Sequence, residues 1–306
     1  MTRKILLAVD ESAHSRQLIR YAARICGRED VRFTLFHIEH FVPEIFARSA
    51  EESAAVRAEL EMIRTEEETG EQSTRSLQKL LQDEGVSEDK IETVVQPIQQ
   101  GIAKDILTYA EDGRFDAIAI ARTGLTPRRD FFIGTVPEKI VEYALDIPVW
   151  IIDGESTSLD FLLAVDGSEN SFRDVEHIIR MVGANPEFKI TLFHAVPRLR
   201  HYYTPEVEKR CPNLQDALRS FDRKRMEAFY TKAYERFEEA GIDQSRISKT
   251  TNSMSYDIST AILDEARREY GTIVVGRRGE RNAFFTGRIA LRMVQKLSGR
   301  NLWVVP

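Results

Sequence analysis

The chain has 306 residues, of which 42% are hydrophobic and 30% charged, a balance typical of a globular protein rather than a disordered or membrane one. Its formal net charge of −6 argues against a broad basic surface for nucleic acid. Cys26 and Cys211 lie far apart without a CxxC partner, so the sequence predicts neither disulfides nor a zinc site. We see no signal peptide and no apolar run of membrane-spanning length, and we therefore expect a cytoplasmic protein with no membrane partner.

Short β-branched apolar runs alternate with helical stretches, a pattern typical of βαβ units in a parallel sheet. In the first half of the chain we predict strands over Ile5–Val9, Arg32–Ile38, Ile91–Gln96, Ala117–Ala121 and Val149–Ile152. Their nearly continuous hydrophobicity predicts burial on both faces, with helices covering each side. The loops that follow parallel strands lie at one edge of the sheet, where open α/β folds bind their ligands.

Two long segments, Ala47–Gln82 and Val207–Glu239, are rich in charged residues and alanine, with apolar residues at helical spacing. Solvated amphipathic helices explain this pattern. The segments are also longer than one return helix requires, so they could instead form partner-binding faces. Exposed apolar residues on these helices would favour that second interpretation.

The sequence repeats itself. The run Ile5–Ser12, an apolar strand ending in an acid, recurs as Phe161–Ser168, and Phe33–His37 recurs as Ile190–His194. The closing strands carry Trp150 and Trp303, and a Phe-Phe pair precedes a glycine in both halves. Such ordered matches predict two homologous domains, residues 1–153 and 160–306, joined by a polar linker at 154–159.

The loop after the fourth strand carries the most specific motif. Ala121-Arg122-Thr123-Gly124 is followed nine residues later by Gly134-Thr135-Val136 at the start of a helix. Glycines allow the backbone to approach a phosphate, and the helix N-terminus favours an anion. Together with the strand-end acids, the strand-end histidines and the Pro-Val-Trp closing strand, this loop resembles the glycine signature of the universal stress protein family.

The resemblance occurs once in each half and so covers nearly the whole chain. It implies both the fold class and the ligand. The fold would be α/β, with two Rossmann-like domains related to the adenine nucleotide alpha hydrolases, each a five-stranded parallel sheet flanked by helices. The ligand would be an adenine nucleotide, ATP, with Mg as a companion ion. The implied contact residues of the first half are Asp10, Ile38 at the adenine, and Gly124, Gly134, Thr135 and Val136 at the phosphates.

The two halves depart from the family pattern in different ways. In the first half Ala121 stands where the family has its first glycine. In the second half Gly276 and Gly279 retain the opening pair, but only seven residues separate Gly279 from Gly287, and Arg288 replaces the Ser or Thr. We therefore expect the first half to be the nucleotide site and the second half to be altered.

Charged residues near these loops suggest two further hypotheses. Arg288 could reach Asp166, the second strand-end acid, so that the protein's own ion pair takes the place of the ligand, or it could hold a free phosphate. Arg128 lies beside the first glycine loop, either as an ordinary exposed arginine or as an anion contact.

Simpler roles compete with these assignments. Asp10 and Asp166 each precede a helical stretch, so helix capping alone would explain them equally well, and Ser12 and Ser168 are expected to be caps rather than nucleophiles. His37 and His40 lie at a strand end. Since the second half lacks the second histidine, we expect a histidine that holds its loop by hydrogen bonds and no metal site.

These patterns favour a regulatory protein that binds an adenine nucleotide and acts through protein partners. The alternative is an interaction scaffold that no longer binds nucleotide. An enzyme is disfavoured because no P-loop, no dinucleotide fingerprint and no catalytic triad is found, although slow ATP hydrolysis or autophosphorylation stays open. The closing strands are sheet-edge candidates that we expect to pair within the chain, and a homodimer stays open.

Overall fold

The computed structural model describes residues 2–10, 12–26, 30–39, 53–122, 136–154, 158–183, 185–201, 203–253, 257–277 and 288–306. Its contacts divide the chain into two compact units, Met1–Tyr143 and Ala144–Pro306. Within the described residues, no helix is both long and apolar enough to cross a membrane.

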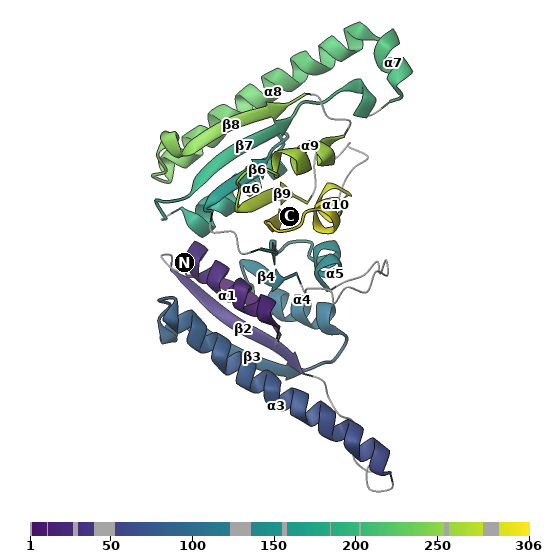
Figure 1. Ribbon diagram of the computed structural model, residues 1–306. Coiled ribbons are helices and arrows are strands. Elements are labelled where there is room, and N and C mark those ends of the chain that lie inside the picture. The colour runs from purple at the N-terminus through teal and green to yellow at the C-terminus, as the bar shows by residue number, and fades with distance from the viewer. Residues whose placement is uncertain are drawn as a thin grey trace. The chain divides into compact units, whose positions relative to one another are not determined.

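The first unit alternates strands and helices as the sequence predicts (Figure 1). Its elements are β1 (Arg3–Val9), α1 (Ala13–Cys26), β2 (Val31–Glu39), α3 (Ala54–Asp83), η1 (Glu88–Lys90, a 3-10 helix), β3 (Ile91–Pro97), α4 (Ile102–Asp112), β4 (Ala117–Ala121) and α5 (Val136–Tyr143). The strands pair in parallel in the order β3-β2-β1-β4. The prediction of burial on both faces is confirmed for β1, β2 and β4, which are almost wholly buried. It is wrong for β3, which has no buried residue because it is the outermost strand of the order.

The second unit contains the last predicted strand of the first half together with the whole second half. Its elements are β5 (Val149–Ile152), β6 (Asp160–Ala164), α6 (Glu169–Val182), β7 (Lys189–Ala195), η2 (Leu199–His201), α7 (Pro205–Arg210), α8 (Pro212–Glu239), η3 (Gln244–Arg246), β8 (Ile247–Asn252), α9 (Ile258–Glu265), β9 (Thr272–Gly276), α10 (Arg288–Lys296) and β10 (Asn301–Val305). The five strands β10-β9-β6-β7-β8 are parallel, as predicted.

The order of these strands locates the ligand edge of the second sheet. The chain runs outward from β6 through β7 to β8 and then returns to β9 on the other side of β6. Right-handed crossovers therefore put α6 and α9 on opposite faces of the sheet. The carboxyl ends of β6 and β9 flank the point where the order reverses, which is where open α/β sheets form a crevice.

The closing strands β5 and β10 pair with each other. They run antiparallel, with Trp150 opposite Trp303, and the two buried indole rings stack with centroids 4.1 Å apart and planes 3° from parallel. The Trp150 Nε1–H donates to Nε2 of His177 on α6, at 3.0 Å. β5 thus lies in the second compact unit together with β10, and the linker at 154–159 stays a prediction.

Candidate functional site

Asp10 lies just beyond β1 and organises the turn into α1. Its Oδ1 accepts hydrogen bonds from the Ser12 amide at 3.0 Å and the Ser15 hydroxyl at 2.7 Å, and also from the Ser12 hydroxyl. The Asp10 amide in turn donates to Ser15 Oγ at 2.9 Å. Asp10 therefore fixes the strand-to-helix turn at the edge where a ligand would enter.

Asp166 makes the equivalent turn in the second unit. Its Oδ1 accepts from the Ser168 amide at 2.9 Å and the Ser171 hydroxyl at 2.8 Å, while its own amide donates to Ser171 Oγ. Ser168 is the N-cap of α6, since its side chain accepts from the Ser171 amide. The expectation that Ser168 acts as a cap is thus confirmed, and the acid before it is not itself the cap.

The charge states of the two acids follow from these contacts. Burial alone would raise the pKa of Asp10, but hydrogen bonds from Ser12 and Ser15 outweigh burial, and the pKa lies below the usual value. Asp166 has the same balance: burial opposes ionisation, the Ser168 and Ser171 hydrogen bonds favour it, and the positive charge of Arg225 lowers the pKa further. Both carboxylates are therefore ionised at neutral pH.

A residue of α8 covers the turn beside Asp166. Gly167 has φ +78°, and an added Cβ would lie 3.0 Å from Arg225 Cγ and 3.1 Å from Met226 Sδ. Arg225 also donates to Asp222 Oδ1 at 3.2 Å. The long helix that the sequence suggested to be solvated thus brings a cation to the strand-end acid of the second unit.

The strand-end histidines hold their loops by hydrogen bonds, as expected. His37 Nδ1 donates to the Val9 carbonyl at 3.1 Å, and His194 Nδ1 donates to the Val165 carbonyl at 2.9 Å. His194 Nε2 also pairs with the buried Asp222 at 2.9 Å, which ties α8 to β7. His40 lies outside the described residues, among which no group of His, Cys, Asp and Glu could hold a metal.

The glycine loops lie largely outside the part of the chain that the structure describes. Outside it are Gly124, Arg128, Gly134, Thr135, Gly279 and Gly287, and the side chain of Arg288. The helix predicted after the first glycine loop is α5, which the structure describes from Val136, and the helix after the second loop is α10, described from Arg288. The cation found to act on Asp166 among the described residues is Arg225, and the pairing of Arg288 with Asp166 stays a hypothesis.

Ala121 and Gly276 occupy the same place in the two sheets, at the last residues of β4 and β9. Neither has a positive φ. The alanine therefore needs no conformation that glycine alone allows, and its effect is limited to one buried methyl group at the strand end. Ile38, the residue that the resemblance implies at the adenine, lies half-buried near the end of β2.

The sequence gives little indication that Asp222 and Arg225 lie at this edge of the second sheet. They lie within a segment whose many charges suggest a solvated helix. The available signal was weak: Asp222, Met226, Phe229 and Ala233 follow helical spacing and are all buried, so they mark one packed face. An acid on that face needs a partner, and His194 supplies it.

The strand order and the strand-end acids define a Rossmann-like α/β protein with a ligand edge beyond the carboxyl ends of its strands. The model of the Universal stress protein family matches residues 1–153, half of the chain. The chain therefore belongs to the universal stress protein family.

Two crystal structures resemble the whole chain in fold. A universal stress protein from Archaeoglobus fulgidus DSM 4304 is 16% identical with a TM-score of 0.58, and the match covers 100% of this chain and 98% of the other. A functionally unknown protein from Pseudomonas aeruginosa PAO1 is 14% identical with a TM-score of 0.60, covering 99% and 92%. A comparison with curated proteins found no match.

Proposed function

We propose that this protein binds ATP, with Mg as companion ion, in its first half and acts as a cytoplasmic regulator of the stress response rather than as a metabolic enzyme. The assignment to the first half rests on one difference between the two strand-end acids: the long helix α8 packs against the turn beside Asp166. Family membership supports an adenine nucleotide as the ligand.

In the second unit, α8 occupies the neighbourhood of Asp166. Arg225 and Met226 approach Gly167 closely, and the buried hydrogen bond between Asp222 and His194 anchors the helix there. A nucleotide entering beside Asp166 would have to displace the Arg225 side chain and its bond to Asp222. Separating charges that are already paired and partly buried is costly, so this half is a poor nucleotide site.

In the first half, the described groups that lower the pKa of Asp10 are the hydrogen-bonding Ser12 and Ser15 and the neighbouring His37 side chain. Among the side chains of α3 that the structure describes, none contributes to the pKa of Asp10 as Arg225 does to that of Asp166. Asp10 keeps an oriented carboxylate at the edge of the sheet, and the described part of α5 starts at Val136, directly after Gly134 and Thr135 in the sequence. A helix start offers free amides to phosphate oxygens, which supports ATP at this edge.

A second candidate function is an interaction scaffold that acts without nucleotide. Phe221 and Leu214 on α8 are 62% and 49% exposed, and seven residues of separation put them on the same face of the helix. Exposed aromatic and aliphatic side chains on one face are typical of partner-binding helices. The methyl group of Ala121 and the shortened second glycine loop also favour this alternative.

The test compares equivalent substitutions in the full-length chain. Nucleotide content would be measured after gentle purification, and ATP with Mg would then be titrated by calorimetry into wild type, Asp10→Ala and Asp166→Ala. We expect Asp10→Ala to weaken ATP binding tenfold or more, about 1.4 kcal/mol, and Asp166→Ala to leave it nearly unchanged.

The two substitutions remove equivalent serine hydrogen bonds at the two strand-to-helix turns, so each controls for the loss of these bonds in the other. Loss of binding in Asp166→Ala alone would move the site to the second half. A wild-type protein that is purified empty and shows no heat with ATP would favour the scaffold function.

A further inference from the structure

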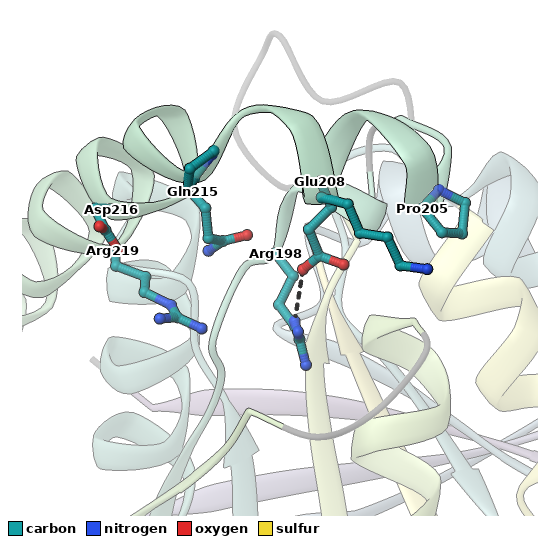
Figure 2. A pocket seen from close by; sticks show the side chains of 8 residues that line it. Arg198, Pro205, Glu208, Gln215, Asp216 and Arg219 are labelled. Carbon is teal, nitrogen blue, oxygen red and sulfur yellow. Dashed lines mark hydrogen bonds and ion pairs between the residues drawn. The ribbon is translucent and has the colours of Figure 1, made fainter.

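A pocket of about 590 Å³ opens between the connection after β7 and the helices α7 and α8 (Figure 2). It is lined by Arg198, Pro205, Glu208, Lys209, Pro212, Gln215, Asp216 and Arg219. Its volume lies within the range of small-molecule sites. Gln215 precedes Arg225 by ten residues of α8, about 15 Å of helix, so the pocket is separate from the crevice at Asp166.

Gln215 provides the most informative feature of the pocket. Its side chain is buried, with the residue only 6% exposed, and its Oε1 accepts a hydrogen bond from the Leu199 amide at 2.9 Å. The amide orientation is thereby fixed, and Nε2 has no hydrogen-bond partner among the described residues. A buried donor without an acceptor raises the free energy of the folded protein. A ligand whose oxygen accepts a hydrogen bond from Gln215 Nε2 would therefore bind more tightly because it removes this cost.

The charges around Gln215 indicate what carries that oxygen. Arg198 is held in place by Glu208, Nε to Oε1 at 3.0 Å, and it donates to the Ser253 carbonyl at 3.3 Å. Arg219 has neither a hydrogen bond nor an ion pair with any described residue. Figure 2 shows Arg198, Gln215 and Arg219 directed toward the same space beneath the helices.

Lys209 adds a third basic group to the lining and, like Arg219, contacts no counter-charge within the described ranges. Glu208 neutralises Arg198, and Asp216 offsets one of the two other basic groups, which leaves the lining with an excess of positive charge. Guanidinium groups bind carboxylates and phosphates through paired hydrogen bonds. An uncharged ligand would use the Gln215 donor but leave this excess charge without a counter-ion.

We propose that this pocket is a second ligand site, which binds the carboxylate or phosphate group of a small anion between Gln215 Nε2 and the guanidinium of Arg219. The site does not depend on the nucleotide site proposed in the first half. Pro205 and Pro212, the first residues of α7 and α8, add apolar atoms to its lining.

The test uses the full-length protein, with inorganic phosphate and citrate as probes. Each would be titrated by calorimetry at constant ionic strength, with chloride as the reference anion. The variants are Gln215→Glu, which keeps the acceptor for Leu199 but replaces the free donor by a negative charge, and Arg219→Ala. Arg223→Ala is the matched control, because Arg223 is an exposed arginine of α8 outside the pocket lining.

We expect saturable binding of at least one probe by wild type, weakened tenfold or more in Gln215→Glu and in Arg219→Ala, and changed less than twofold in Arg223→Ala. The preferred probe would identify the anion as phosphate or carboxylate. Circular dichroism would verify folding, and should Gln215→Glu fail to fold, Arg219→Ala carries the test. Absence of saturable binding, or equal weakening by Arg219→Ala and Arg223→Ala, would overturn the proposal.

Discussion

His177 makes the stability of the second unit sensitive to mild acid. Burial lowers the pKa of His177 to about 3 from an ordinary value of 6.5, and the nearby charge of Arg180 acts in the same direction. The neutral ring accepts the Trp150 indole hydrogen bond. Because the unfolded chain binds a proton near pH 6.5 and the folded chain does not, the contribution of His177 to stability is full above that pH and decreases as the pH falls.

The size of this effect follows from the two pKa values. Between pH 8 and pH 5 the linkage amounts to about 2 kcal/mol, because over this interval the unfolded chain takes up a proton and the folded ring stays neutral. Substituting His177→Gln retains an acceptor for Trp150 without a group that titrates in this range. We expect the variant to lose about 2 kcal/mol less stability than wild type over the same pH interval.

Urea unfolding followed by tryptophan fluorescence measures this quantity. Trp150 and Trp303 are the chain's two tryptophans, and both lie in the stack beside His177. Other histidines contribute equally to both proteins, so the difference between wild type and variant isolates His177. An identical pH dependence in the two proteins would refute a buried neutral His177.

Two further predictions concern the packing around α6 and α8. Gly167→Ala should lower the free energy of unfolding, measured with urea, by at least about 1 kcal/mol more than Gly241→Ala does. Both glycines have positive φ, but only at Gly167 would an added Cβ meet Arg225 and Met226. Equal losses of stability in the two variants would contradict the close packing of α8 on this turn. Burial raises the pKa of Asp174 well above its usual value, and neither carboxylate oxygen has a partner among the described residues. The contribution of Asp174 to the free energy of unfolding is therefore lost as pH rises from about 4. Asp174→Asn should raise the free energy of unfolding at pH 7 by on the order of 1–3 kcal/mol. Unfolding curves of wild type and variant that coincide at pH 7 would argue against a buried protonated acid.

Local pattern was sufficient for most of the secondary structure. Ala117–Ala121 and Val149–Ile152 form strands with the predicted bounds, because runs of buried β-branched and small apolar residues have few other ways to be covered. The turns at Asp10 and Asp166 were also visible, since an acid followed by serine can satisfy the amides of a strand-to-helix turn locally.

The sequence by itself determined the duplication, the strands and the two strand-end acids, because each depends on residues close together in the chain. The pairing of the closing strands was expected from the sequence, but only the tertiary structure decided that they run antiparallel with Trp150 opposite Trp303, and that Arg225 covers the turn beside Asp166. The buried donor of Gln215 was likewise visible only in the folded chain. Contacts of this kind join residues distant in sequence, and which of a helix's many charges turn inward depends on the surface against which it packs.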